Sequence, residues 1–369
     1  MYTPSKIVPI LLAMACAAFG QPARLDSRST MHITLPEDSP VSVVSADWGE
    51  SNATPRGGAM LLDLHTSLVL KNTGQRRIRG VTMLVQAQEV TPGGRASVSV
   101  PSLNVASGQT FPVRIDMSLL RPLQPGSGPL VEITLDGILF DDLSFFGPNR
   151  LNSRRSMTVW ELEAMRDRQY YKEVLQSRGR DGLKAEMIAS LNRQADRSQM
   201  DARVSSGRAT ASAASGRLVQ LAFLNAPNAP VVPEQGFARV TNDEARGPQI
   251  HMRNQSDRAV DSVELGWIVK DARGKEYVSG AIPLEVGLAP RARSKVVQDA
   301  SFKFSEAGGQ GIAIESMTAF LSSVQFSDGK MWVPDRSKFL PTPSPEEQRL
   351  VELYRRRGIE VLVEELKRY

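Results

Sequence analysis

Residues 71–81 read KNTGQRRIRGV, and they align without a gap on residues 253–263, which read RNQSDRAVDSV. Further along, residues 140–150 (FDDLSFFGPNR) align on residues 326–336 (FSDGKMWVPDR). The offset is 182 residues from 71 to 253 and 186 residues from 150 to 336, so the two copies have nearly the same length. Two anchors in the same order, about 70 residues apart in each copy, indicate that one domain occurs twice.

The length and charge of the chain agree with this duplication. A chain of 369 residues usually holds two or three domains, and each repeat of roughly 120 residues can bury a core without a metal or a disulfide. The formal net charge of +5 is mild and gives little support to nucleic-acid binding, which usually shows a concentrated basic stripe. We therefore expect no nucleic-acid partner.

Residues 1–20 have the pattern of a secretory signal peptide. Lys6 supplies the positive charge, residues 7–15 are apolar, and residues 18–20 (AFG) form a small-x-small cleavage pattern. The apolar stretch is too short to span a bilayer, and no later stretch has the roughly 20 apolar residues of a transmembrane helix. The chain is therefore expected to be exported, to the periplasm or the outside of the cell.

Cys16 is the one cysteine of the chain, and cleavage after Gly20 would remove it. The alternative is a lipoprotein anchored at Cys16, but Ala13 stands where lipoprotein signals prefer a branched aliphatic residue. Because an exported chain without cysteine cannot form disulfides, its domains must be stable from core packing alone. This composition is typical of a bacterial envelope protein.

Alternating apolar and polar residues predict strands in both copies. In residues 31–150, Leu62, Leu64 and Leu68 alternate with polar residues, as in a half-buried strand. In residues 218–340, Val263, Leu265 and Trp267 form the inward row of one strand. Turn residues recur at spacings of about 10 residues, which is typical of a β-sandwich or barrel. We expect two β-sandwich domains, at 31–150 and 218–340.

These features resemble the immunoglobulin-like or fibronectin-III-like domains of exported bacterial proteins. The resemblance rests on the turn at residues 72–74 (NTG) between two alternating strands, and on the later turn at 288–290 (LAP), with 105–107 (VAS) opposite. It also rests on Trp267, placed where such sandwiches bury a tryptophan on the third strand. It covers about two thirds of the chain and implies a fold but no particular function, because unrelated functions share this fold.

The segment between the copies predicts helices. Thr158 and Glu161 match a capping box that would start a helix to about residue 176, and a second helix is expected at about 182–196. The helical connector is thus placed at 157–200, and the Ser/Thr-rich residues 201–217 are expected to be a flexible linker. A further helix is expected at 345–369, with Ser344 as its capping residue and Gly358 as a break.

Catalytic, cofactor and metal motifs are absent from the sequence. Its histidines are His32, His65 and His251, none with a partner at ligand spacing, and there is no phosphate loop or nucleophile elbow. We expect no cofactor and no metal. Acidic residues of the connector such as Glu163 and Asp167 face the neighbouring arginines Arg166 and Arg168, which predicts a mostly solvated face.

Three aromatic residues outside the repeats are candidates for partner binding. Trp160 and Tyr171 lie on one face of the predicted connector helix, and Tyr170 is adjacent. The alternative is that these side chains dock the helix on a sandwich. The leading hypothesis is a non-enzymatic binding or structural protein of the cell envelope, whose partner is a protein or an envelope polymer. The alternatives are an envelope hydrolase with its site in the central helices, and a periplasmic assembly or chaperone-like factor that binds extended chains at sheet edges.

The signal peptide generates the first prediction. Processing is expected between Gly20 and Gln21, because the small-x-small pattern ends there. Mass spectrometry of the exported protein should give an N-terminus at Gln21. A mature chain that begins with an acylated Cys16 would contradict the prediction.

Overall fold

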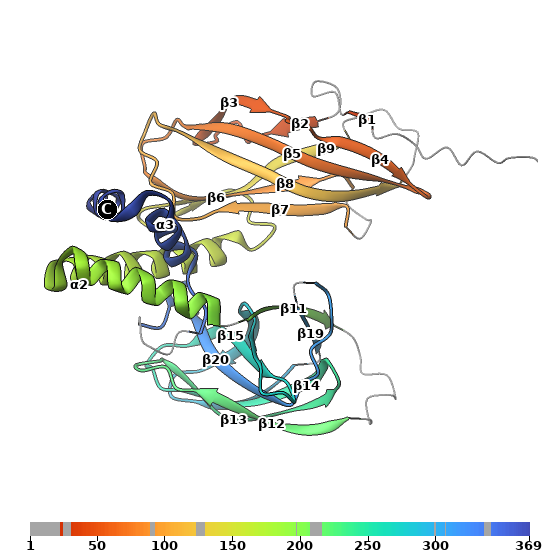
Figure 1. Cartoon of the computed structure of the whole chain (residues 1–369). Coiled ribbons are helices and arrows are strands. Elements are labelled where there is room, and N and C mark those ends of the chain that lie inside the picture. The colour runs from red at the N-terminus through yellow and green to blue at the C-terminus, as the bar shows by residue number, and fades with distance from the viewer. Residues whose placement is uncertain are drawn as a thin grey trace, which may run out of the picture. The chain divides into compact units, whose positions relative to one another are not determined.

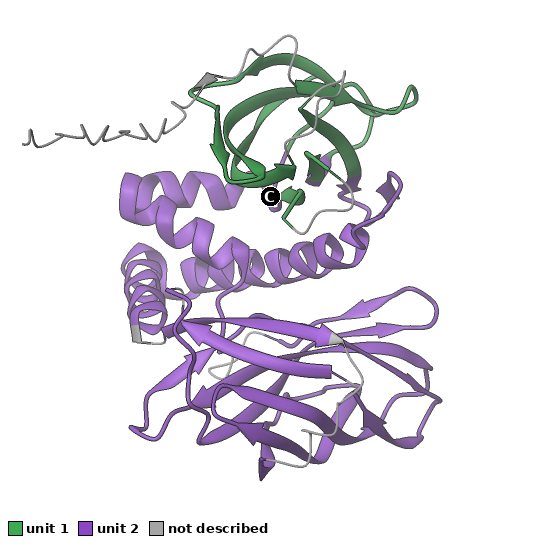
Figure 2. Cartoon of the chain, turned by 90° about the vertical axis from the view of Figure 1, so that its right-hand side faces the viewer, with its two compact units in different colours: residues 1–77, 82–99, 105–136 green, residues 78–81, 100–104, 137–369 purple. Residues whose placement is uncertain are grey.

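The structure is a computed structural model, and it describes residues 23–24, 31–88, 93–122, 130–196, 198–206, 216–298, 300–306, 308–335 and 341–369. Strands hold 50% of the described residues and helices 21%, so the expected mainly β chain with a C-terminal helix is confirmed (Figure 1). The predicted signal peptide and Cys16 lie outside the described residues. Contacts divide the chain into two compact units (Figure 2), one made of residues 1–77, 82–99 and 105–136 and the other of the remaining residues.

The first repeat contains two sheets. One has the strand order β1-β4-β5-β3 with β8 also paired to β5, and the other has the order β10-β9-β6-β7 with β2 paired to β9. The bounds are β1 Ala23–Arg24, β2 Met31–Thr34, β3 Val41–Asp47, β4 Asn52–Arg56, β5 Ala59–Asn72, β6 Ile78–Gln86, β7 Arg95–Val100, β8 Thr110–Pro122, β9 Val131–Phe140 and β10 Phe145–Phe146.

The strands of the second repeat close into a ring. Hydrogen bonds follow the order β15-β16-β11-β19-β14-β13-β12-β20, and β20 pairs with β15 again. The bounds are β11 Ser198–Ser206, β12 Arg217–Leu224, β13 Val231–Thr241, β14 Glu244–Asn254, β15 Val260–Lys270, β16 Glu276–Val278, β17 Ile282–Leu288, β18 Arg293–Val297, β19 Ala300–Glu306, β20 Ser316–Phe326 and β21 Met331–Trp332. Strand β11 pairs with both β16 and β19, and β12 pairs with both β13 and β20, so these strands join what would otherwise be two sheets. The expectation of two separate sheets therefore does not hold in the second repeat.

The position of β11 corrects the sequence-based expectation for this region. Residues 201–206 were expected to belong to a flexible linker, but they lie in β11, which pairs antiparallel with β19 along seven residues. The remaining described linker residues, 216 and 217, precede or begin β12, and 207–215 lie outside the described residues. The strand covers an edge that would otherwise expose the backbone groups of β19.

Asn72 and Asn254 occupy equivalent turns. The side-chain amide of Asn72 donates to the carbonyls of Arg76 (2.9 Å) and Val105 (3.1 Å), and its oxygen accepts from the backbone N–H of Gly74 (3.0 Å). The amide of Asn254 donates to the carbonyls of Arg258 (2.7 Å) and Ala289 (3.0 Å), and its oxygen accepts from the N–H of Ser256 (2.9 Å). Both asparagines are buried.

The second anchor is equivalent as well. The N–H of Phe140 donates to the carbonyl of Ser144 at 3.0 Å, and the N–H of Phe326 donates to that of Lys330 at 2.9 Å. Each of these tight turns leads into a two-residue strand, β10 or β21, that pairs back on the preceding strand. In each copy, moreover, the second of the strands named above runs parallel to the strand before this turn, β2 along β9 and β12 along β20. The aligned stretches of sequence thus form the same local structures.

The helices have partly the expected bounds. Helix α2 (Ser153–Asp196) is interrupted at Gly179, whose φ of 68° is left-handed, so two helices are present as predicted. The predicted capping box is wrong, because the helix begins before Thr158 and the Thr158 hydroxyl donates to the carbonyl of Arg154 inside it. Helix α3 (Pro345–Lys367) begins as predicted, since the Ser344 hydroxyl accepts from the N–H of Glu347 at 3.0 Å. It is also interrupted at Gly358, as expected.

Trp267 lies in the core of the second repeat, as predicted. It is 1% exposed, its ring centroid is 5.7 Å from that of Phe302, and its neighbours Val263, Leu265 and Val269 in the same row are buried too. The indole Nε1 is buried without a hydrogen-bond partner among the described residues. The contribution of Trp267 to stability therefore comes from packing.

Trp267→Ala should lower the free energy of unfolding by about 3–5 kcal/mol, because it leaves a large cavity. Trp267→Phe should cost less, because it keeps an aromatic ring and removes an unpaired buried donor. Chemical denaturation of the mature chain, with hydrogen exchange to locate the effect in the second repeat, measures both. An unchanged unfolding midpoint for Trp267→Ala would mean that the indole contributes nothing to the core.

Candidate functional site

The aromatic candidates of the connector have different environments. Tyr171 is fully buried in an apolar cluster shared by α2 and α3, whose other members include Val174, Met187, Leu350 and Leu362. Tyr170 is half-buried against the same cluster, with its ring centroid 5.3 Å from that of Tyr171, and Trp160 is also half-buried. Tyr171 is thus a packing residue, whereas partner binding by Trp160 or Tyr170 stays a prediction.

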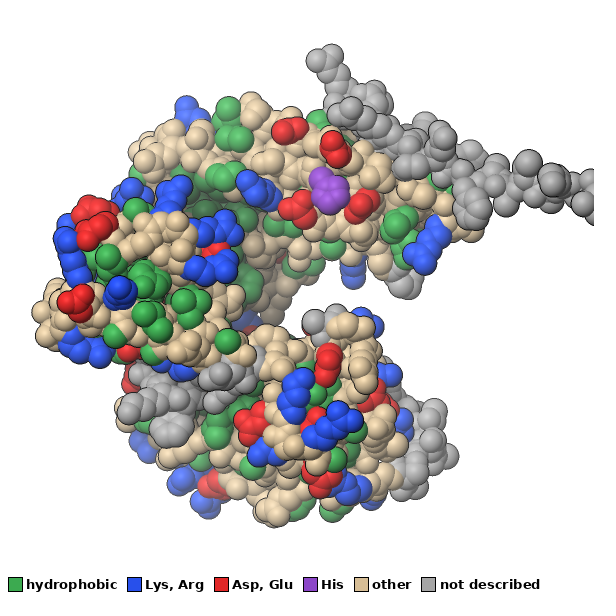
Figure 3. All heavy atoms as spheres, viewed as in Figure 1, with side chains coloured by type: hydrophobic (Ala, Val, Ile, Leu, Met, Phe, Trp, Pro, Cys, Tyr) green, Lys and Arg blue, Asp and Glu red, His purple; other side chains and the backbone are tan. Residues whose placement is uncertain are grey.

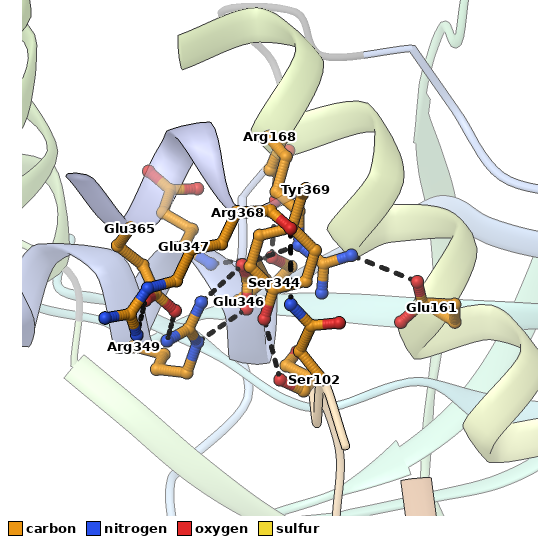
Figure 4. Close-up of polar contacts among 12 residues, drawn as sticks. Ser102, Glu161, Arg168, Ser344, Glu346, Glu347, Arg349, Glu365, Arg368 and Tyr369 are labelled. Atoms are coloured by element: carbon orange, nitrogen blue, oxygen red, sulfur yellow. Dashed lines mark hydrogen bonds and ion pairs between the residues drawn. The ribbon is translucent and has the colours of Figure 1, made fainter. Parts of the chain in front are cut away.

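A buried network of charged side chains joins α2 to the start of α3 (Figure 4). The Ser344 hydroxyl, which caps α3, also bonds to the carboxylate of Asp167, which is buried. Glu346 in the first turn of α3 is 0% exposed, and it accepts from Arg168 Nε at 2.8 Å and from Arg349 Nε at 2.8 Å. Carboxylates at this position also interact favourably with the positive end of the α3 dipole.

The network continues to Tyr369. Arg168 donates from Nη1 to Glu161 Oε1 at 3.0 Å, and its guanidinium carbon lies 3.8 Å from the Tyr369 ring centroid. Arg79 reaches the same groups, 3.6 Å from Glu161 Oε1 and 5.1 Å from the ring centroid. The Tyr369 hydroxyl donates to the carbonyl of Ser102 at 3.4 Å. The contacts of Arg168 and Arg79 are charge-assisted or cation–π interactions, whereas the bond from Tyr369 to Ser102 joins two neutral groups.

Burial and ion pairing shift the pKa values of the network in opposite directions. Burial raises the pKa of Glu161, although Arg168 opposes that shift. Burial would also raise the pKa of Glu346, but bonds and charges from Arg349 and Arg168 outweigh it and lower the pKa. Burial alone would lower the pKa of Arg168, but the nearby carboxylates of Glu346 and Glu161 outweigh this effect and raise it. The network therefore holds its charges in fixed pairs.

The connector is consequently not the solvated face that the sequence predicted. Glu161, Asp167 and Arg168 are 3%, 0% and 4% exposed. Arg168 pairs with Glu346 in α3, and Asp167 bonds to Ser344, the residue that caps α3. The network also extends to the closed ring of strands in the second repeat, because Arg155 Nε lies 3.2 Å from Glu264 Oε1 on β15. Removing one member of such a buried pair is strongly destabilising, since the other charge stays buried without a partner.

Glu163, which the sequence predicted to lie on a solvated face, has a strongly shifted pKa. Burial raises its pKa to about 7, opposed by Arg166 and reinforced by the negative charges of Asp167, Glu264 and Glu347. Two of these acidic neighbours come from segments distant in sequence, so no local pattern could have revealed the shift. A carboxyl group with this pKa exchanges protons near neutral pH.

A second cluster lies on the outer face of the first repeat. His65 on β5 is 49% exposed, with Nδ1 3.2 Å from Asp116 Oδ1 and Nε2 3.4 Å from Asp63 Oδ2. The hydrogen bond that His65 makes to the Asp116 carboxylate is the main cause of the raised pKa of His65. Ser118 donates to Asp63 at 3.0 Å and so does not form a serine–histidine pair. The described residues contain no group of three or more His, Cys, Asp or Glu that could hold a metal ion.

A small cavity lies between β12 and β13 in the second repeat. Its volume is about 130 Å³, and it is lined mainly by apolar residues, including Phe223, Leu224, Val231, Pro233 and Leu321. This space suits one apolar side chain or a few waters. The carboxylates described above do not line it.

Comparisons with known proteins name no relative. No protein family matches the sequence, and no curated protein does. Among solved structures, red sea bream transglutaminase is 10% identical with a TM-score of 0.13, covering 81% of this chain and 32% of that one. A β-glucosidase from Kluyveromyces marxianus is 10% identical with a TM-score of 0.17, covering 74% of this chain and 45% of that one. The chain thus spans less than half the length of these proteins, and such low TM-scores support no inference about fold or function.

Two surface properties complete the description. Among the described residues, no helix is long and apolar enough to cross a membrane. On the face seen in Figure 3, Lys and Arg side chains lie among Asp and Glu side chains.

Glu163 generates a pH-dependent prediction. Because its pKa is about 7 in the folded chain and about 4.5 in the unfolded chain, its neutral form favours folding. This contribution is complete below about pH 4.5 and is lost as the pH rises through 7. Glu163→Gln should therefore stabilise the protein by about 1–2 kcal/mol at pH 8 relative to the wild type, and less at pH 5.

Denaturation at several pH values measures the effect. The control is Glu352→Gln, because Arg355 and Arg356 lower the pKa of Glu352 to about 2, so its loss brings no stabilisation at pH 8. If wild type and Glu163→Gln depend on pH in the same way, Glu163 does not have the raised pKa.

Proposed function

We propose that the protein is an exported, non-enzymatic binding or structural protein of the cell envelope. In this proposal its two repeats are immunoglobulin-like domains that present the binding surfaces, and α2 and α3 form a rigid connector. Its partner is a protein or an envelope polymer. Export is supported by the signal-peptide pattern of residues 1–20, and the immunoglobulin-like assignment by the equivalent turns at Asn72 and Asn254.

The observation that carries the proposal is the use of the connector's charges inside the protein. Arg168 binds Glu161 and Glu346, Asp167 binds Ser344, and Arg155 approaches Glu264. Groups held in this way are not available to a substrate, and their pairing fixes the helices in place. The helices therefore serve as a support, which leaves the strands and turns of the repeats to meet a partner.

A second candidate function is an envelope hydrolase with its site in the central helices. It is favoured by Glu163, because a carboxyl group with a pKa of about 7 suits general acid–base catalysis. The cavity between β12 and β13 does not support a hydrolase site in the central helices. It is lined by residues of the second repeat, and no carboxylate is among them. The binding role is therefore the better account.

Site-specific photo-cross-linking in the producing cells tests the proposal. The cross-linker replaces Lys71 on β5 or His251 on β14, both exposed on the repeats, and Lys184 on α2 is the matched exposed position on the connector. We expect one envelope component to be captured from a repeat position and not from position 184. Capture from position 184 alone would contradict the proposal. So would turnover of an envelope polymer that is lost in Glu163→Gln, which would favour the hydrolase.

A further inference from the structure

Strand β3 forms an edge of its sheet (Figure 1), and within the described residues it pairs only with β5. A strand that packs on a core buries every second residue, but Val43, Val44 and Ser45 are all exposed, Val43 by 38% and Val44 by 55%. The pairing shifts between Val43 and Ser45, so Val44 has no residue opposite it on β5. The centre of β3 thus presents apolar side chains and backbone on an open edge.

The second repeat protects the same position. Val41 lies opposite Asn72 and Val231 lies opposite Asn254, so β3 and β13 are in equivalent register. The β13 pairing also shifts at the same point, between Pro233 and Gln235. There the residues are Pro233, Glu234 and Gln235, where β3 has Val43, Val44 and Ser45.

Proline and charge on an edge strand are the usual means of preventing unwanted strand pairing. Such residues also occur on the edge strands β8, β17 and β18, namely Pro112, Arg114, Pro283, Glu285, Arg293 and Lys295. From Val41 to Ala46, β3 has neither proline nor charge. The contrast between the two repeats indicates that this edge is left open for a strand.

The charge around β3 indicates which strand fits. No Lys or Arg occurs between Arg28 and Arg56, although the whole chain has a net charge of +5. Within this stretch, exposed carboxylates lie beyond both ends of the apolar centre, at Glu37, Asp38, Asp47 and Glu50. Lys71 on β5, opposite Ser42, is the cation on the paired part of the neighbouring strand.

We propose that β3 binds an extended segment of another polypeptide, with β-branched apolar residues at its centre and cationic residues at its ends. The added strand would extend the β3–β5–β8 sheet by backbone hydrogen bonds. A second copy fits poorly, because antiparallel pairing of two β3 strands about Val44 would place Glu50 opposite Asp38. This inference rests on the proposed binding function and names the partner's chemistry.

The probe is a fluorescent peptide of about nine residues, with three central valines and lysines at both ends, titrated into the full mature chain. We expect saturable binding that weakens with salt. A peptide with glutamates in place of the lysines should bind at least about tenfold more weakly, and so should one with a central proline, which cannot complete the backbone bonds.

Variants locate the site. Val43→Pro should fold, because the equivalent position in β13 is Pro233, and it should weaken binding by about tenfold or more. Val44→Lys should do the same by adding a cation to the edge. Val297→Lys is the matched control, because Val297 is 57% exposed on the charged edge strand β18, and it should leave binding unchanged.

Equal binding by wild type and Val44→Lys, or preference for the glutamate peptide, would overturn the inference. So would a wild-type dimer that Val44→Lys dissociates, which would assign the edge to a second copy. If cross-linking captures an envelope partner but this peptide does not bind, the inference fails while the proposed function stands. Binding of the peptide with no envelope partner captured supports the site and contradicts the wider function.

Discussion

Each β repeat depends on one buried asparagine. The side chains of Asn72 and Asn254 hold together the turn that follows their own strand and a segment more than 30 residues further along, at Val105 and Ala289. A carbonyl left unpaired in such a place costs about 1–3 kcal/mol. An apolar residue could not make these bonds, and an aspartate would lack the two donors. The asparagine therefore fixes the path of two separate segments in each copy.

The two copies then diverge at their edges. In the second repeat β11 and β12 pair with both layers and complete a ring of strands, and Pro233 and Glu234 protect the remaining edge of β13. In the first repeat β3 has Val43 and Val44 at the corresponding place. The duplicated turn maintains the fold in both copies, while the edges differ in their ability to accept another strand. A shared turn that maintains the fold, together with an edge that differs between the copies, is consistent with a binding role.

Local patterns in the sequence predicted much of the fold. The alternation around Trp267 was enough to place its side chain in the core, because a strand has only two faces. The Ser344 cap, the break at Gly358 and the division of the connector into two helices also follow from local chemistry. The matched asparagine turns were visible because their hydrogen bonds need the same residue in both copies.

The errors concern interactions between distant residues. Arg168 and Glu346 are 178 residues apart in sequence, so the sequence predicted a solvated Arg168 and did not reveal their pairing. In strand β11, Met200, Ala202 and Val204 alternate with polar residues, but the Ser- and Thr-rich composition of residues 201–217 as a whole favoured a linker. The partner of β11, strand β19, lies far away in the sequence, so composition alone does not indicate the pairing. The environment of Glu163 was hidden for the same reason.

The most direct test of the duplicated turn is substitution of each asparagine by alanine, with the exposed Asn225 as control. Hydrogen exchange resolves the opening free energy of each repeat separately. The account predicts that Asn72→Ala destabilises the first repeat and Asn254→Ala the second, each by about 2–4 kcal/mol, while Asn225→Ala changes neither. If either buried asparagine can be replaced without loss of protection in its own repeat, the two turns do not carry the role assigned to them.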